Sequence, residues 1–151
     1  MTHAPSFSLF DQTGIMHTLS QYKGKWIILY FYPKDDTPGC TKEACNFRDS
    51  FKDFTDAGVV ILGVSKDSVA SHKKFVEKYH LQFPLLSDES KEVIKAYGAW
   101  GMKKFMGKEF EGVKRTTTLI GPDGIIQKVY ENVNPITHAG QILKDIQQVQ
   151  K

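Results

Sequence analysis

Apolar and polar positions alternate along the chain in a way that predicts strands and helices in turn. Two uninterrupted apolar runs, residues 26–32 and 59–64, have the length of strands and the composition of strands buried on both faces of a sheet. Shorter strands are expected at residues 7–10, 83–86, 116–120 and 125–131. Gly121-Pro122-Asp123-Gly124 is a turn sequence that predicts a hairpin between the last two strands.

Apolar side chains at helical spacing predict four helices, at residues 38–55, 69–79, 89–97 and 137–149. Helices therefore alternate with buried strands first, and a hairpin and a helix close the chain. This order predicts an α/β fold with a central mixed β-sheet and helices on both faces, and a thioredoxin-like arrangement is the nearest common pattern. No internal repeat or linker is visible, so residues 1–151 are expected to form a single domain.

Composition and charge exclude several classes of protein. The net charge is only +3 and no block of Lys and Arg is present, so we expect no nucleic-acid partner. The longest apolar run is far shorter than the ~20 residues that span a bilayer, so we expect no membrane partner. The N-terminus shows no basic stretch before an apolar one, so the expected location is the cytoplasm, where cysteines rest as thiols.

The segment that carries chemistry surrounds the two cysteines, Cys40 and Cys45. Thr37 is a good N-cap residue and Pro38 suits the first position of a helix, which places Cys40 in the first turn. Unpaired N–H groups and the helix dipole favour an anion there, so Cys40 is expected to react as a thiolate.

Cys45 lies five residues after Cys40, a spacing that separates their Cα atoms by roughly 8.6 Å in an intact helix. A disulfide rarely tolerates more than about 7 Å, so a redox pair here must unwind the first turns, and Gly39 would ease that change. Three other interpretations stay open from the residues alone. The cysteines could be inert buried residues, or they could serve a thiol–disulfide exchanger, although the Cys-x-x-Cys motif of such proteins is absent. They could also bind a metal, but the histidines are scattered along the chain and argue against a metal site.

At this point the sequence resembles a known family. Pro33-x-x-x-Thr37-x-x-Cys40 matches the signature of the peroxiredoxins, and the run from Phe31 through Asp49 resembles the bacterioferritin-comigratory-protein subgroup, also called PrxQ. The resemblance extends over nearly the whole chain and includes residues 4–9, 64–68, 83–88 and 115–124.

The resemblance implies a thiol peroxidase that reduces hydrogen peroxide and organic (alkyl) hydroperoxides. Cys40 would be the peroxidatic cysteine that becomes a sulfenic acid, and Cys45 the resolving cysteine that forms an intramolecular disulfide with it. Thioredoxin is the implied reductant, and no metal or other cofactor is implied because sulfur carries the chemistry. An intramolecular disulfide needs no second chain, so we expect a monomer.

Roles for the neighbouring residues follow from the same resemblance. Thr37 would offer its hydroxyl to the thiolate or the peroxide, Pro33 would shield the thiolate from water, and the backbone N–H of Gly39 would help hold a peroxide oxygen. Arg115 matches the family's distant active-site arginine, which would favour the thiolate and polarise the peroxide. Glu43 would orient Arg115 or stay an exposed helix charge, and Arg48 is a weaker candidate of the same kind.

Two further points stay open. Trp100, Phe105, Met106 and Phe110 lie in a glycine-containing segment, residues 98–112, that could wall an apolar substrate entrance, although we favour ordinary core or loop cover. A thioredoxin-fold chaperone or binding module, whose cysteines do no turnover, is the rival from another class. Such a module would keep both thiols when mixed with peroxide.

Overall fold

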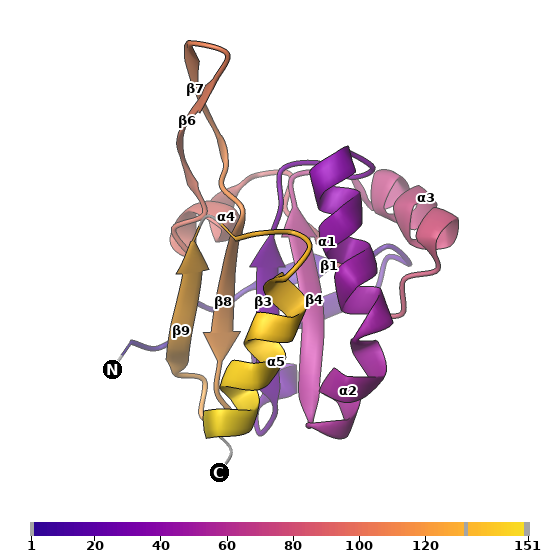
Figure 1. Cartoon of the computed structure of the whole chain (residues 1–151), viewed down its shortest axis with the longest axis vertical. Coiled ribbons are helices and arrows are strands. Elements are labelled where there is room, and N and C mark those ends of the chain that lie inside the picture. The colour runs from indigo at the N-terminus through magenta and orange to yellow at the C-terminus, as the bar shows by residue number, and fades with distance from the viewer. Residues whose placement is uncertain (1, 132, 150–151) are drawn as a thin grey trace.

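The computed structural model describes residues 2–131 and 133–149, and a mixed sheet of seven strands forms its centre (Figure 1). The strands lie in the order β2-β1-β5-β4-β3-β8-β9. Their bounds are β1 Ser8–Phe10, β2 Met16–Thr18, β3 Trp26–Phe31, β4 Val59–Ser65, β5 Leu85–Ser87, β8 Thr116–Ile120 and β9 Ile126–Glu131. β3 pairs parallel with β4 and antiparallel with β8, which confirms the predicted mixed sheet.

Helices pack on both faces of this sheet, as the sequence predicts. Their bounds are η1 Ser20–Tyr22 (a 3-10 turn), α1 Pro38–Asp49, α2 Phe51–Asp56, α3 Val69–Tyr79, α4 Glu92–Ala96 and α5 His138–Val149. In Figure 1, α1 and α5 lie in front of β3 and β4, and α4 lies behind the sheet. None of the described helices is long and apolar enough to cross a membrane.

The core follows from the alternation of side chains along β3, whose residues Ile27–Phe31 are at most 2% exposed. Ile28 and Tyr30 point to the face covered by α1, α3 and α5, where they join one apolar cluster. Leu29 and Phe31 point to the opposite face, where they pack with Ile94 of α4. The expectation of a central strand buried on both faces is therefore confirmed.

Three parts of the structure differ from the sequence-based expectation. The helix expected at residues 38–55 is interrupted at Ser50, whose backbone (φ −101°, ψ 4°) leaves the helical region. The short edge strand β2 was not predicted. Two further strands, β6 Trp100–Phe105 and β7 Lys108–Val113, pair as a separate hairpin that projects from the body (Figure 1). Its turn uses Met106 and Gly107, both at positive φ (51° and 81°), as tight hairpin turns require.

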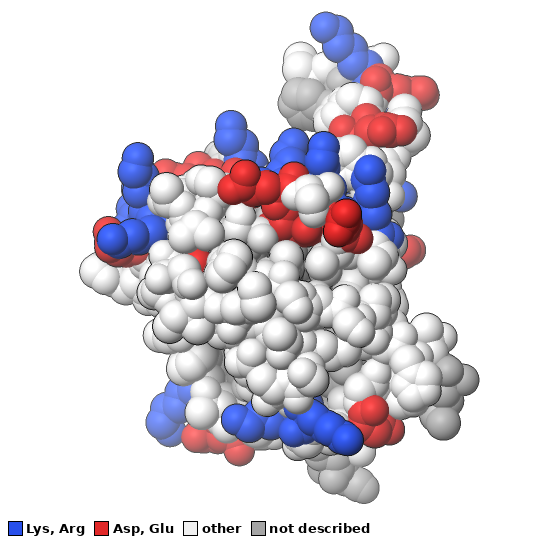
Figure 2. Space-filling model, turned by 180° about the vertical axis from the view of Figure 1, so that it is seen from behind, with Lys and Arg blue, Asp and Glu red and all other residues white. Residues whose placement is uncertain are grey.

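On the rear face of the molecule, charged side chains gather at the two ends. Figure 2, which views the molecule from behind, shows Lys, Arg, Asp and Glu in an upper and a lower band with an uncharged face between them. The upper end is the one toward which β3 runs in Figure 1, and α1 begins there. The carboxyl end of β3 therefore lies at an end of the molecule that carries charged side chains.

Candidate active site

The start of α1 forms one wall of the site. Thr37 is its N-cap, with extended backbone angles, and the Thr41 N–H donates to the Thr37 carbonyl over 2.8 Å. Pro38 occupies the first turn, as predicted. The Thr37 hydroxyl, however, makes no capping bond; it donates to the Lys34 carbonyl over 2.9 Å. In this state the Thr37 hydroxyl is thus engaged by its own loop and not by Cys40.

Cys40, Glu43 and Arg115 converge at the first two turns of α1. The Cys40 side chain is buried, and Arg115 donates from Nη2 to its Sγ over 3.3 Å. The other terminal nitrogen, Nη1, donates to Glu43 Oε1 over 2.7 Å. One planar guanidinium therefore joins the Cys40 thiol to the buried Glu43 carboxyl group. These two contacts hold the guanidinium in a single orientation.

The sheet register explains why Arg115 reaches a cysteine 75 residues away. β8 runs antiparallel to β3, with Thr116 opposite Phe31. Arg115 therefore emerges at the edge where β3 ends and the loop to α1 begins. This position confirms the expectation that its guanidinium reaches Cys40 from a neighbouring strand.

Gly39 leaves space for the close approach of Arg115. A Cβ atom at residue 39 would lie 3.0 Å from Arg115 Nη2, which is tighter than ordinary van der Waals contact. Any larger side chain would press on the nitrogen that contacts Cys40. The sequence suggested Gly39 for its backbone N–H and for flexibility; the structure adds the space that it leaves for the guanidinium.

Burial dominates the electrostatics of the pair. Glu43 is 1% exposed, and this desolvation raises its pKa to about 7 although Arg115 opposes the shift. Its second oxygen, Oε2, has no hydrogen-bond partner among the described residues. Burial would lower the pKa of Arg115, but Glu43 and Cys40 raise it overall, so its guanidinium stays charged. Glu43 is therefore a buried partner of Arg115 and not an exposed helix charge.

The raised pKa of Glu43 predicts a pH-dependent stability. Between the unfolded value near 4.5 and the folded value near 7, the folded protein holds a proton that the unfolded chain releases. The free energy of unfolding should therefore fall as pH rises through this window, by on the order of 3 kcal/mol. Glu43→Gln should remove that part of the slope, which denaturant unfolding at pH 4 to 8 measures. The exposed Glu109→Gln is the control, and equal slopes in the parent and Glu43→Gln would contradict the prediction.

Cys45 lies on the same helix and is half-buried, and both thiols are free. Because α1 is helical from residue 38 to 49, the separation estimated from helix geometry applies, and the two sulfurs cannot bond while the helix is intact. Arg48 does not join the site. Its Nη1 donates to the Tyr79 carbonyl over 2.8 Å and its Nε pairs with Asp49, so it ties α1 to α3.

An opening of about 420 Å³ leads from the surface to Arg115. It is lined by Pro33, Met102, Lys103, Lys104, Lys114 and Arg115. Pro33 lines this opening, and its role in shielding the thiolate from water stays a prediction. The three lysines were not expected from the sequence because they lie on the unpredicted hairpin and next to it.

The apolar entrance considered for residues 98–112 is not what the structure contains. Met106 is 88% and Phe110 44% exposed, and neither lines the opening. Trp100 lies instead beneath the amino groups of Lys91 and Lys95, and the side chain of Phe105 lies outside the described part of the chain. The preferred alternative, core or loop cover, is also wrong for Met106 and Phe110, because a hairpin exposed on both faces buries neither.

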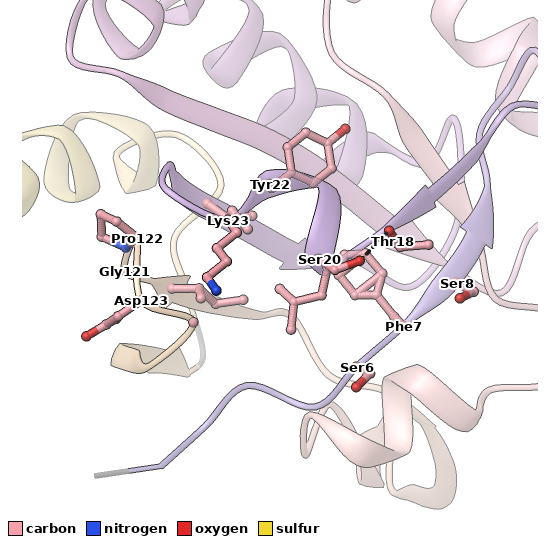
Figure 3. Close-up of a pocket in the computed structure, with 14 residues that line it drawn as sticks. Ser6, Phe7, Ser8, Thr18, Ser20, Tyr22, Lys23, Gly121, Pro122 and Asp123 are labelled. Carbon is pink, nitrogen blue, oxygen red and sulfur yellow. Dashed lines mark hydrogen bonds between the residues drawn. The ribbon is translucent and has the colours of Figure 1, made fainter.

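A second cavity, of about 350 Å³, lies near the other end of the sheet (Figure 3). Figure 3 shows Ser6, Phe7 and Ser8 on one side and Gly121, Pro122 and Asp123 on another, with Tyr22 and Lys23 of the η1 region between them. No cysteine lines this cavity. The Cys40 thiol lies instead beside Arg115, which lines the first opening.

Comparisons with known proteins find relatives along nearly the whole chain. A sequence model of the AhpC/TSA family matches residues 1–129. A protein of Coxiella burnetii named putative peroxiredoxin bcp is 49% identical over 140 residues, which cover 93% of each chain. Peroxiredoxin Bcp of Bacillus subtilis is 46% identical over 143 residues, covering 95% of this chain and 91% of the relative.

A solved structure is similar over nearly the whole fold. It is the bacterioferritin comigratory protein of Xanthomonas campestris, studied for its alkyl peroxide reduction activity. It superposes with a TM-score of 0.91 at 36% sequence identity, covering 96% of this chain and 92% of the other.

Proposed function

Because the chain belongs to the AhpC/TSA family and is a thiol peroxidase of the peroxiredoxin Bcp and Q type, we propose that Cys40 is its peroxidatic cysteine and Cys45 its resolving cysteine. The observation that carries this assignment is the Arg115 guanidinium, which contacts both the Cys40 sulfur and the buried Glu43. The whole chain, residues 1–151, acts as one such domain.

The first step is attack of the Cys40 thiolate on one oxygen of the peroxide. An S–O bond forms and the O–O bond breaks, so the sulfur is oxidised to a sulfenic acid and the peroxide is reduced. The departing oxygen takes a proton and leaves as water or an alcohol. Arg115 and the N–H groups at the start of α1 lie where they stabilise the negative charge that passes from sulfur to oxygen.

The residues around Cys40 orient the peroxide and limit water. Pro33 lines the entrance, and Gly39 leaves room for Arg115. Thr37 is next to the helix start, but its hydroxyl is bonded to the Lys34 carbonyl. For Thr37 to donate to a bound peroxide, rotation of its side chain must exchange this carbonyl for the peroxide oxygen.

The second step joins the two cysteines. The Cys45 thiolate attacks the sulfenic sulfur, an S–S bond forms, and hydroxide leaves and becomes water. Helix geometry requires α1 to unwind between the two cysteines before this bond can form. Two contacts hold the far end of that segment. The Asn46 side chain accepts from the Ala139 N–H at the start of α5, and Arg48 donates to the Tyr79 carbonyl.

An external dithiol must then reduce the disulfide, and we propose a thioredoxin-type reductant, which exchanges electrons through the same thiol chemistry. Peroxides are the substrates, and we propose that both hydrogen peroxide and alkyl hydroperoxides are reduced. Because both cysteines of the disulfide lie in one chain, its formation needs no second subunit, and this supports a monomer. We therefore also propose a cytoplasmic location, where thioredoxin-type reductants act.

A thiol count after one equivalent of hydrogen peroxide tests the proposal. We expect both thiols to disappear together, and mass spectrometry of a digest to find one linkage between Cys40 and Cys45. A binding module would retain two thiols at equivalence. A protein thiol–disulfide exchanger would react with disulfides but consume no peroxide, and either result would contradict the assignment.

A further inference from the structure

A buried histidine–aspartate pair joins α3 to the loop between β3 and α1 and is not used in the mechanism above. His72, on α3, is completely buried, and Asp35, in the middle of the loop, is 7% exposed. His72 Nδ1 lies 2.7 Å from Asp35 Oδ2. A histidine and a carboxylate seldom occupy such a place without a function or a full set of partners.

Both ring nitrogens of His72 face acceptors. Nδ1 faces Asp35, and Nε2 lies 3.0 Å from the Leu86 carbonyl oxygen. A neutral imidazole carries only one N–H, so it cannot donate to both. The contacts are satisfied when His72 carries both protons beside an ionised Asp35, and equally when a protonated Asp35 donates to Nδ1 and Nε2–H donates to Leu86; in both states a short hydrogen bond joins Asp35 to His72.

The Asp35 carboxylate has donors on every side. Tyr32 donates to Oδ1 over 2.6 Å, and Ser71 donates to Oδ2 over 2.8 Å. Burial, followed by the Asp35 charge, raises the pKa of Tyr32 well above its usual value, so the phenol keeps the proton that it donates. Two residues of α3, Ser71 and His72, and Tyr32, which directly follows β3, therefore hold one carboxylate.

The backbone of Asp35 is held as well. Its N–H donates to Asp67 Oδ2 over 2.9 Å, and the same oxygen accepts from the Ser65 hydroxyl over 2.6 Å. Asp35, Asp67 and His72 bring one potential metal-ligand atom each to within 4.8 Å of one another. These atoms all have hydrogen-bond partners in the protein, so the cluster is explained as a hydrogen-bonded network.

This network sits at the centre of the loop that serves Cys40. Asp35 is two residues after Pro33, which lines the opening, and two residues before Thr37, which caps α1. The intervening Asp36 has a φ of +57°, a conformation that side-chain-bearing residues adopt at a cost. A loop with this conformation keeps its shape only where surrounding contacts impose it.

We propose that the Asp35–His72 pair is a positioning element that holds the Pro33–Thr37 loop in the geometry needed for peroxide attack at Cys40. The pair touches neither the thiol nor the substrate; it acts through the backbone of Asp35. The inference rests on the proposed role of Cys40. The contacts come from α3 and from the segments that follow β3 and β4, so unwinding of α1 need break none of them.

Two substitutions of His72 separate positioning from simple space-filling. His72→Asn places an amide nitrogen near the position of Nδ1, so it keeps a donor toward Asp35 and loses the bond to Leu86. His72→Gln places its nitrogen near Nε2, so it keeps the Leu86 bond and removes the donor to Asp35. The two variants thus differ in which neighbour of residue 72 keeps its hydrogen bond, while both remove the imidazole ring.

We expect His72→Gln to slow the single-turnover oxidation of Cys40 by hydrogen peroxide about tenfold or more, because small displacements at a reacting centre have large effects on rate. His72→Asn should stay within about threefold of the parent. Alkylation of Cys40 by iodoacetamide, which needs no aligned peroxide, should change less than about threefold in either variant. The neighbouring exposed Lys73→Ala is the matched control and should react at the parent rate.

Equal rates in the two His72 variants, or equal losses toward peroxide and iodoacetamide, would overturn the inference. If either His72 variant does not fold, Ser71→Ala removes one donor to Asp35 from a less buried position. It should slow peroxide oxidation about threefold, and a parent rate would equally overturn the inference. Cys40→Ser is measured alongside. If it is inactive while His72→Gln keeps the parent rate, the positioning role alone is wrong; turnover in Cys40→Ser would contradict the proposed function itself.

Discussion

Cys40→Ser should reduce peroxide consumption to the background rate. A serine hydroxyl stays protonated at neutral pH and is a poor nucleophile toward peroxide. The hydrogen bond from Arg115 would then reach a neutral oxygen in place of a reactive sulfur. The measurement is peroxide loss in the presence of a thioredoxin system. The buried position of Cys40 tolerates the smaller side chain, so we expect the variant to fold.

Cys45→Ser is the matched control for this experiment, because it removes the other thiol of the same helix. Its Cys40 should still react once with peroxide, at a rate close to that of the parent. Peroxide consumption by Cys40→Ser at the parent rate would show that another group does the chemistry. Retained alkylation of Cys45 in Cys40→Ser would show that the loss is specific to the reacting thiol.

Cys45→Ser should itself block catalytic cycling with thioredoxin, by about a hundredfold or more. One sulfenic acid should form per chain, and trapping with dimedone followed by mass measurement would detect it on Cys40. Without Cys45 no intramolecular disulfide can form, so a dithiol reductant loses its usual target.

A small monothiol provides the control for this second experiment. It can attack the sulfenic acid directly and restore turnover, since that route does not pass through Cys45. Cycling with thioredoxin at the parent rate in Cys45→Ser would show that Cys45 is not the resolving thiol. A failure of the monothiol to restore turnover would point to damage at Cys40 rather than to a missing resolving step.

The main sheet was predictable because its strands carry strong patterns. β3 and β4 are apolar runs buried on both faces, and the Gly-Pro-Asp-Gly turn marks the β8–β9 hairpin. The β6–β7 hairpin was missed because it buries little of either face, so its sequence carries no clear alternation. Met102 and Phe110, for example, are 56% and 44% exposed.

The residues nearest to the sulfur could be predicted, and those that support them could not. Cys40, Gly39 and Glu43 lie within one short motif, and Arg115 follows from the family resemblance. The lysines of the opening depend on the unpredicted hairpin. His72 is a single histidine in a helix, and its partner Asp35 lies 37 residues earlier in the chain, so no local pattern joins them.

The tethers at Asn46 and Arg48 bear on how far the sulfur can be oxidised. A sulfenic acid that waits can meet a second peroxide and become a sulfinic acid, which thiols do not reverse. Because the unwound segment is fixed beyond Cys45, the resolving thiol searches a small volume, and short tethers correspond to effective concentrations on the order of millimolar. Under the proposed roles, a second peroxide therefore competes with a tethered thiol as soon as α1 has unwound, and the anchored end of the helix favours the disulfide over the sulfinic acid.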